Sequence, residues 1–371
     1  MNYFLYRFSP AGIGILAHHH LTVICPSRQV VNYLERGFDE HHILACDDFS
    51  LANLLDLLES QETIDTIFTL DEGLMHLTGL LTSILTPDKQ AWKVAYAYKD
   101  KKIMRQRLEG QIPQPTLIHP DEKLPKQFMI KPRCKASGNG VFKVSQLPDN
   151  YSNEDYLLET VEEFDTMFTC DGIALDGKIT YFFSHEYIGN ILDIKKDFVN
   201  IVRTNSRYPD KEFIKRLQVS TQKVLDGLGT EPVHPFHAEF FYNSQTDTLR
   251  FCEIGKRFGG ANIPLLIKNA FQIDILELYW QAINGNPIPK QEQDFPTKIA
   301  CTLAIFQNGR HQAPPTLPVP LDAYRSYPEK TSASAQSLDD LRFLINFSLE
   351  DETAWEKLAP ILKEYSDEQR N

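Results

Sequence analysis

The sequence lacks any apolar segment long enough to cross a membrane. No run of apolar residues approaches the roughly 20 residues that a membrane-spanning helix needs. Residues 1–20 also lack the basic start and the long apolar core of a secretory signal peptide. We therefore expect a cytoplasmic protein without a membrane partner.

Cysteine is scarce and irregularly placed, which argues against a disulfide scaffold or a structural zinc site. The six cysteines include no CxxC pair, and most have apolar neighbours, as buried free thiols do. They are Cys25, Cys46, Cys134, Cys170, Cys252 and Cys301. The histidine runs at 18–20 and 41–42 do not replace them, because adjacent side chains point apart and cannot all bind one ion.

Positive charge is also in short supply. Lysine and arginine number 38 against 50 acidic residues, which gives a net charge of −12. This balance argues against non-specific binding to nucleic acid, although it permits a local basic pocket for an anion. Two nucleotide-binding signatures are missing as well. No GK[ST] follows a glycine loop, and "GIG" at 12–14 lacks the third glycine of a dinucleotide fingerprint.

What is present indicates an α/β protein. The 371 residues suffice for two or three domains, and the sequence shows no internal repeat. Strand-like runs at 3–8, 21–27 and 64–70 alternate with helical runs at 50–61 and 71–85. Alternation of this kind predicts a parallel sheet in the first hundred residues.

The rest of the chain reads as strand-rich segments separated by a few helices. A proline-rich stretch after about residue 289 and a charged helix near the end indicate a small C-terminal subdomain. The expected segments are a helix ending near Gly110, a strand at 126–132, a hairpin at 167–188, helices at 212–229 and 264–285, and a helix within 348–371.

Two glutamates stand inside strand-like runs on either side of a turn. If 237–242 and 249–255 are antiparallel neighbours, period-two alternation puts His237, Glu239 and Phe241 on one face. The same rule puts Phe251, Glu253 and Gly255 on one face of the partner strand. Two carboxylates that project together favour a shared cation, and Mg²⁺ prefers such oxygen ligands. The alternative is that each glutamate pairs with a lysine or arginine, or faces water.

Two further motifs supply groups that bind phosphate or carboxylate. Lys131 ends an apolar strand and precedes a flexible loop at 137–140, whose glycines would let backbone N–H groups close over phosphate oxygens. Arg257 follows Glu253 by four residues and precedes two glycines. Its planar guanidinium matches a carboxylate or a phosphate.

Taken in order, these motifs resemble the ATP-grasp superfamily, in particular its carboxylate–amine ligases, including L-amino-acid ligases. The resemblance covers roughly residues 1–290 and is carried by Asp100-Lys101, "MIKPRCKASGNGV", "ETVEEF", "DGIALDGKI", "HAEFF" and "CEIGKRFGG". It implies an α/β pre-ATP-grasp domain at 1–98 and an ATP-grasp domain at 99–290 with a lid at about 115–165. Residues 291–371 would be the small C-terminal subdomain.

The resemblance also implies roles for individual residues. Lys101 and Lys131 would contact the phosphates, with Lys131 also catalytic, and Ser137, Gly138 and Gly140 would belong to a mobile flap. The nucleotide would be held by the Glu162 carbonyl, by Glu163, by the N–H of Phe164 or Asp165, and by Met129 and Phe241 around adenine. Glu239 and Glu253 would bind Mg²⁺ or Mn²⁺. Arg257 would bind the carboxylate and stabilise developing charge, near His237, Gly259 and Gly260.

Some positions depart from the family pattern or allow two interpretations. Met167 stands where relatives carry an acid that binds ribose, and Gly255 stands where many have asparagine. Glu72 either faces the substrate or is an acid favoured at a helix N-terminus. Arg203 and Arg207 either reach a substrate or belong to a solvated loop.

The expected function is ADP-forming ligation of a small-molecule carboxylate, with amino acids the leading substrates, to an amine through an acyl phosphate. Two alternatives stay open. One substrate could be bound to a carrier protein, or the chain could bind ATP without ligation. Family habit favours a homodimer.

Overall fold

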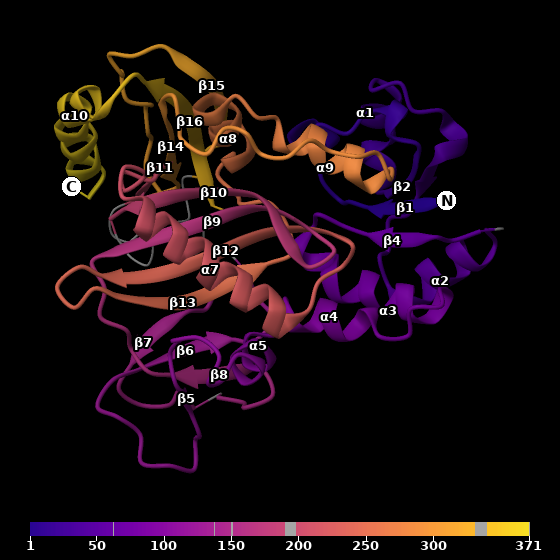
Figure 1. The fold of residues 1–371 in the computed structure, drawn as a ribbon, viewed down its shortest axis with the longest axis horizontal. Helices are drawn as coiled ribbons and strands as arrows, with labels where there is room; N and C mark the ends of the chain where they lie inside the picture. The colour runs from indigo at the N-terminus through magenta and orange to yellow at the C-terminus, as the bar shows by residue number, and fades with distance from the viewer. Residues whose placement is uncertain (62, 137, 150, 190–197, 331–339, 371) are drawn as a thin grey trace.

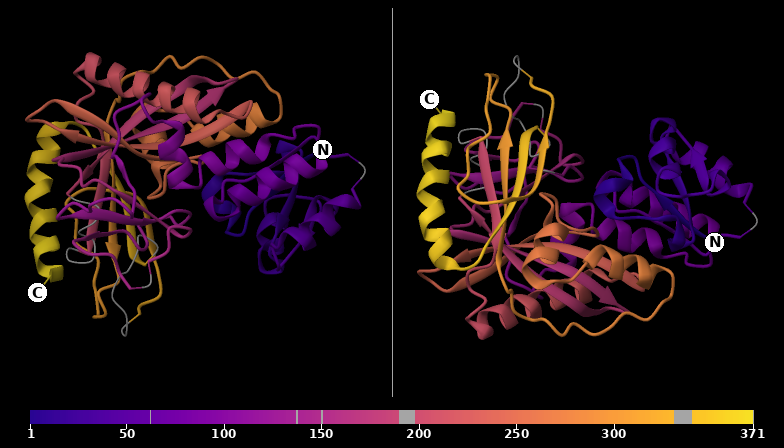
Figure 2. Two further views of the ribbon diagram at one scale, coloured as in Figure 1. Left: turned by 90° about the horizontal axis from the view of Figure 1, so that it is seen from below. Right: turned by 90° about the horizontal axis from the view of Figure 1, so that it is seen from above.

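The computed structural model describes residues 1–61, 63–136, 138–149, 151–189, 198–330 and 340–370 (Figure 1). These residues form three sheets of four, eight and four strands. The N-terminal sheet lies at one end of the long axis and the C-terminal helix at the other (Figures 1 and 2).

The N-terminal sheet is parallel, as the alternation of strands and helices predicts. Its strands have the order β3-β2-β1-β4. Ser50 begins α2 because its hydroxyl accepts a hydrogen bond from the Asn53 N–H. The elements are β1 (Asn2–Leu5), β2 (Leu21–Cys25), α1 (Val30–Leu34), β3 (Ile43–Ala45), α2 (Leu51–Glu59), β4 (Thr66–Phe68), α3 (Met75–Leu85) and α4 (Ala91–Ala97).

The second sheet, named the lid sheet, is small and antiparallel, and its strands fall within residues 115–165. It follows α5 (Lys101–Arg107), which Asp100 caps by accepting from the Lys102 N–H at 2.9 Å. The strand order is β5-β8-β6-β7. The strands are β5 (Leu117–Ile118), β6 (Phe128–Pro132), β7 (Phe142–Val144) and β8 (Tyr156–Glu159).

The third sheet has eight antiparallel strands in the order β13-β12-β9-β10-β11-β14-β16-β15. Its first hairpin turns at Asp176 and Gly177, which both have positive φ, as a tight two-residue turn requires. The strands are β9 (Thr166–Leu175), β10 (Lys178–Ile188), β11 (Val199–Thr204), β12 (Val233–Asn243), β13 (Thr248–Gly255), β14 (Ile299–Phe306), β15 (Leu321–Ser326) and β16 (Leu341–Leu349).

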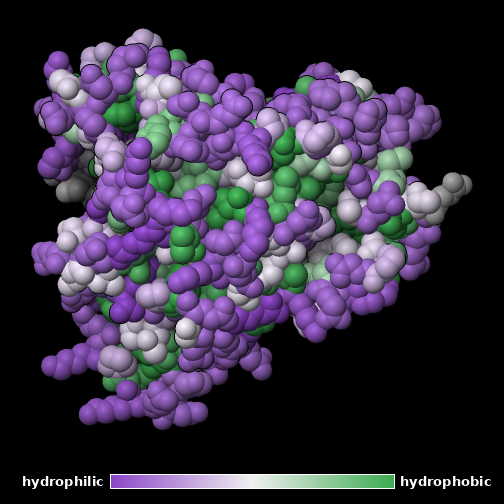
Figure 3. All heavy atoms as spheres, in the orientation of Figure 1, coloured by the Kyte–Doolittle hydropathy of each residue, from purple (hydrophilic) through white to green (hydrophobic). Residues whose placement is uncertain are grey.

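Helices cover this sheet on both sides. The amphipathic α7 (Lys211–Leu228) crosses β9 and β10 and buries Phe213, Leu217 and Val224 (Figure 1). On the face seen in Figure 3, hydrophilic side chains cover most of the surface. No described helix is both long enough and apolar enough to cross a bilayer.

The N-terminal sheet and the large sheet share an apolar core. Trp280 of α9 is fully buried and packs edge-on against Phe4 with ring centroids 5.1 Å apart. Its indole N–H donates to the Ile13 carbonyl at 2.7 Å. The first hundred residues are therefore held firmly against the rest of the chain.

Two expectations about the second half of the chain need correction. The single helix expected at 264–285 is two helices, α8 (Ile263–Phe271) and α9 (Ile275–Ile283). Gln272 adopts the left-handed conformation and ends α8, and the Asp274 side chain then caps α9. A continuous apolar pattern concealed this break.

The segment assigned to a small C-terminal subdomain adds β14, β16 and β15 to the large sheet. Its helix α10 (Glu352–Arg370) packs on the outer strands, where the buried Arg203 pairs with Glu352 and lies 4.6 Å from the Trp355 ring. β14 pairs with β11, β16 with β14 and β15 with β16, so these three strands belong to the same layer. Arg203 thus has a structural role here, while Arg207 pairs with Asp210 at 2.7 Å and stacks on Phe213.

Candidate active site

A cavity of about 1610 Å³ opens where the three sheets meet. The lid sheet, the large sheet and the end of β1 all contribute to its walls. Among the expected site residues, those that line it are Glu72, Lys101, Met129, Lys131, Gly138, Glu162, Glu163, Phe164, Asp165, His237, Glu239, Phe241, Glu253, Arg257 and Gly260. Residues from seven separate sequence segments therefore converge on one space.

The two glutamates lie directly opposite each other across β12 and β13. The register then shifts by one residue, because Phe240 pairs with Phe251 and leaves Cys252 as an extra residue in β13. The expectation that Phe251 shares a face with Glu253 is wrong for this reason. Phe251 is buried in the core on the other face, beside Phe240.

The bulge at Cys252 is held by a buried cluster beneath the lid. Arg105 donates from Nη2 to the Cys252 carbonyl at 2.5 Å and from Nε to Glu159 at 3.0 Å. Glu159 also receives the Lys131 ammonium at 2.5 Å. Burial opposes the charge on Lys131, but the adjacent carboxylate outweighs it and the pKa of Lys131 is raised. Arg105 and Lys131 carry two positive charges and Glu159 one negative charge, so the cluster has a net charge of about +1 at the cavity wall.

Glu239 is nearly buried, yet its surroundings favour the charged form. The Tyr187 hydroxyl donates to its Oε1 at 2.8 Å, and His237 Nε2 lies 3.6 Å from the same oxygen. Burial would raise the pKa of Glu239, but His237 and Tyr187 outweigh it and the pKa is lowered. Glu253 is more open and lies 3.4 Å from the Lys101 ammonium.

His237 belongs to a buried chain of polar groups. Its Nδ1 lies 2.7 Å from Asp171 of β9, which also accepts from Thr169 at 2.8 Å and lies 3.3 Å from His185. Burial would lower the pKa of His237, but Asp171 outweighs it and raises the pKa to about 9. The ring is thereby held with its other nitrogen toward Glu239.

Arg257 crosses from the large sheet to the N-terminal unit. Its Nη2 lies 2.7 Å from Glu72 Oε2, and Lys99 lies 3.6 Å from the other oxygen. Burial would raise the pKa of Glu72, but Arg257 and Lys99 lower it to about 2. Burial also lowers the pKa of Lys99. Because its pKa is low and it lines the cavity, Glu72 faces that space as the charged partner of Arg257.

The segment between β8 and β9 has open backbone groups. The Asp165 N–H donates to the Tyr242 carbonyl at 3.0 Å, so it is already engaged. Among the described residues nothing bonds the Glu162 carbonyl or the Phe164 N–H. Glu162 is fixed through its side chain by Arg250 at 3.1 Å. Of the two N–H groups expected to bond adenine, only that of Phe164 is without a hydrogen-bond partner among the described residues.

The glycines of the expected site fall into two groups. Gly138 and Gly260 line the cavity, while Gly140 and Gly259 do not, and Ser137 lies outside the described residues. Gly140 has φ +78°, a conformation that favours glycine. A Cβ on Gly259 would lie 2.7 Å from His237 Nδ1, so this glycine lets the backbone pass behind the histidine.

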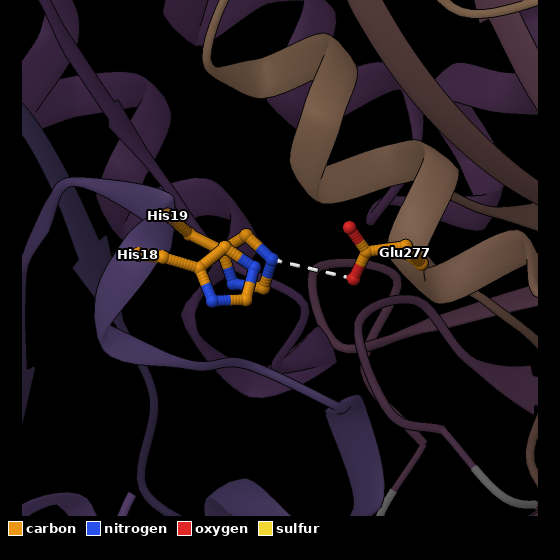
Figure 4. A group of neighbouring side chains, drawn as sticks. All are labelled: His18, His19 and Glu277. Carbon is orange, nitrogen blue, oxygen red and sulfur yellow. Dashed lines mark ion pairs between the residues drawn. The ribbon is translucent and has the colours of Figure 1, made fainter. Parts of the chain in front are cut away.

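One histidine run does approach an acid. Figure 4 shows His18 and His19 beside Glu277 of α9, with possible ligand atoms within 4.8 Å of one another. However, His19 Nδ1 accepts from the Leu16 N–H at 3.0 Å, so a neutral ring carries its proton on Nε2. That nitrogen points at Glu277, 3.5 Å away. With its proton on Nε2 the ring has no lone pair there for a metal, and the contact with Glu277 falls within ion-pair range without forming a hydrogen bond.

Four cavity or network residues escaped the sequence reasoning, namely Lys99, Glu159, Asp171 and Tyr187. Glu159 and Asp171 carried a usable signal, because each is an acid inside an apolar strand, as Glu239 is. Lys99 and Tyr187 carried none, since nothing local distinguishes them from ordinary surface or core residues.

Searches against models of protein families and against curated protein sequences give no match. Solved structures match at the level of fold. An L-amino acid ligase from Bacillus licheniformis has a TM-score of 0.70 at 13% identity, over 98% of this chain and 96% of that chain. A carboxyaminoimidazole ribonucleotide synthase from Aspergillus clavatus, complexed with ATP, gives 0.71 at 13% identity over 100% and 99%. A biotin carboxylase from Campylobacter jejuni gives 0.63 at 13% identity over 96% and 89%.

Proposed function

Because the chain has the ATP-grasp fold, we propose that it is an ATP-dependent ligase that joins a carboxylate to an amine and releases ADP and phosphate. The observation that carries this proposal is the pairing of Glu239 with Glu253 in the same cavity as Lys101, Lys131 and Arg257. Two carboxylates facing three cations suit a polyphosphate and its metal better than any neutral ligand.

The donor set fits a divalent cation. Glu239 and Glu253 offer hard carboxylate oxygens from directly opposed positions. The surroundings of Glu239 lower its pKa, and Glu253 opens to the cavity. These two residues would hold Mg²⁺ or Mn²⁺, which when bound neutralises charge on the phosphates.

The nucleotide would lie between the lid and the large sheet. The free Glu162 carbonyl and Phe164 N–H form a donor–acceptor pair suited to the adenine edge. Met129 lies on the lid side, and Phe241 packs against Phe164 with the rings tilted by 36° and their centroids 4.7 Å apart. Met167 also lines this region, so its contribution is apolar rather than a ribose contact.

Lys101 and Lys131 would bind the phosphates. Both reach the cavity with their ammonium groups already beside a carboxylate, Glu253 and Glu159 respectively. An incoming polyphosphate would therefore draw Lys101 from Glu253, and would thereby free that carboxylate for the cation.

The chemical steps follow from charge and positioning. A carboxylate held by Arg257 attacks the γ-phosphorus through one oxygen, the bond from that phosphorus to ADP breaks, and an acyl phosphate forms. The amine then attacks the acyl carbon, the bond to phosphate breaks, and the amine loses a proton. Arg257 offsets the repulsion between two anions in the first step. A closed lid would exclude the water that otherwise hydrolyses the intermediate.

The identity of both substrates belongs to the proposal as well. Amino acids are the leading class, because the cavity pairs a guanidinium with carboxylates at its reacting end. No observation on the described residues favours a carrier-bound substrate, a nucleic acid or a particular oligomer.

A product assay tests the proposal. ADP and phosphate release from ATP and Mg²⁺ would be measured against pairs of amino acids, with Glu253→Gln as the inactive variant and the exposed Glu109→Gln as its matched control. We expect release that needs both a carboxylate and an amine, and that is lost only in Glu253→Gln. AMP and pyrophosphate as products would refute the acyl-phosphate route, and ATP binding without turnover for any pair would indicate a non-catalytic binder.

A further inference from the structure

The cavity extends well beyond the groups assigned to ATP. Its wall continues along the face of the large sheet through Tyr187 and Val202 to the C-terminal strands. There, four lining residues pair directly across four adjacent strands: Asn200 of β11, Ala304 of β14, Leu344 of β16 and Arg325 of β15. Neighbouring strands lie about 4.8 Å apart, so this row spans roughly 14 Å.

The middle of the row is apolar. Ala304 and Leu344 form a small buried cluster with Phe306, and Leu341 and Tyr327 pack against it. All five residues line the cavity. This wall suits a hydrocarbon or aromatic portion of a ligand rather than a phosphate.

The two ends of the row are polar and have no partner within the described chain. The Asn200 side chain belongs to a residue that is only 6% exposed, yet no described residue hydrogen-bonds its amide. The Arg325 guanidinium forms no ion pair or hydrogen bond with any described residue. The Asn200 amide is not among the fully buried unpartnered groups, so it opens to the cavity, where it can hydrogen-bond water or a ligand.

Arg325 differs in this respect from the cations at the other end. Lys99, Lys101, Lys131 and Arg257 each have a carboxylate nearby. Among the described lysines and arginines that line the cavity, only Lys135 and Lys143 of the lid, together with Arg325, form no ion pair. A charged side chain on an edge strand such as β15 discourages pairing with another chain. That effect would explain a charge anywhere on β15, but it does not explain why Arg325 lies on the cavity face.

Tyr6 also lines the cavity and interacts electrostatically with an arginine at each end. Burial and Asp71 raise the pKa of Tyr6 to about 12, and both Arg257 and Arg325 act on it in the opposite direction. Its phenol therefore lies within electrostatic reach of both arginines. A ligand whose reacting group contacts Arg257 would extend past Tyr6 toward Arg325.

We propose that Arg325 binds a second anionic group, a carboxylate or phosphate, on one of the two ligase substrates, while the apolar wall of Ala304, Phe306 and Leu344 and the Asn200 amide contact the part of that substrate between this group and the reacting end. To call the ligand a substrate, this inference rests on the proposed function. Binding at Arg325 can nevertheless be measured without turnover. The substrate class is an amino acid, or a similar small molecule, that carries an oxyanion separate from its reacting group.

Matched pairs of ligands that differ only in charge test this site. Binding to the full chain with ADP and Mg²⁺ would be measured by calorimetry for L-glutamate and L-glutamine, L-aspartate and L-asparagine, and O-phospho-L-serine and L-serine. We expect at least one acidic member to bind about tenfold to a hundredfold more tightly than its neutral partner, as a charge-assisted hydrogen bond allows.

Variants assign the preference to a residue. Arg325→Gln should reduce it to about twofold or less, and Arg325→Lys should retain part of it, because the charge remains without the planar fork. Lys143→Gln, on the lid, and Arg28→Gln, an exposed arginine outside the cavity, should leave it intact.

Three outcomes would overturn the assignment: no pair shows a preference for the acid, the preference survives Arg325→Gln, or Lys143→Gln removes it equally. ADP release measured in parallel separates the two proposals. An Arg325-dependent preference without ADP release from any pair would refute ligation and still support the site.

Discussion

The two ends of the cavity treat charge in opposite ways. At the end formed by β12, β13 and the lid, Lys101, Lys131 and Arg257 each face a carboxylate. At the end formed by β14, β15 and β16, Arg325 faces none within the described residues. The first end can keep several cations close together without ligand because carboxylates neutralise them. The second end leaves its charge for a ligand to neutralise.

Removal of Glu159 should have the largest effect and would show how far the paired end depends on its carboxylates. Glu159→Gln leaves Arg105 and Lys131 buried side by side without an anion. Loss of one partner of a buried ion pair typically costs about 3–5 kcal/mol. The free energy of unfolding from urea denaturation should fall by about that amount. A loss below about 1 kcal/mol would mean that the cluster is hydrated or rearranges.

Arg257→Gln should have the next largest effect, on turnover rather than on folding. Loss of a group that stabilises charge in the transition state typically lowers kcat by about 100-fold to 1000-fold. The kcat for ADP release measures this, once a substrate pair is found. Glu72→Gln keeps the guanidinium and should lower kcat much less. Equal losses in both variants would indicate that the ion pair acts as a structural link.

His237 gives the paired end a dependence on pH. Its pKa is about 9 in the folded chain and about 6.5 when unfolded, since Asp171 stabilises the charged ring. The associated stability is fully present below pH 6.5 and is lost as the pH rises through 9. Its upper bound is about 3 kcal/mol.

Urea denaturation without nucleotide or metal, from pH 6 to pH 9.5, would measure this loss for the natural chain and for His237→Gln. The difference in unfolding free energy between the two should shrink as the pH rises. A difference that does not change with pH would show that Asp171 holds a neutral ring.

Arg325→Gln should have the smallest effect on folding, and it is the direct counterpart of Glu159→Gln. An exposed side chain without a partner typically changes the free energy of unfolding by less than about 0.5 kcal/mol. Urea denaturation of the ligand-free protein checks this value. A loss above 1 kcal/mol would indicate a structural contact, and the contrast between the two ends would then disappear.

The sequence predicted the layers of the fold better than their connections. Alternating runs in the first hundred residues predicted the parallel sheet, and that prediction is confirmed. Period-two alternation placed Glu239 on the correct face because β12 is regular. It misplaced Phe251 because the bulge at Cys252 depends on Arg105, a residue 147 positions away.

Long-range pairing explains most of what could not be predicted. Glu72 forms an ion pair with Arg257, which lies 185 residues later, and no local sequence pattern relates the two. The row from Asn200 to Arg325 exists only because β14 and β16 insert between β11 and β15. Residues on different strands become neighbours through register, which depends on the whole sheet rather than on any one segment.

The buried Trp280 has a practical consequence. Its indole bonds to the Ile13 carbonyl of the first unit, so its surroundings change if that unit separates from the large sheet. The chain has only three tryptophans, and the other two, Trp92 and Trp355, lie on α4 and α10. Replacement of these two by phenylalanine would leave a single tryptophan fluorophore at the seam, which can be excited selectively over the tyrosines. The emission of that fluorophore would then follow the opening of the seam in real time without an attached dye.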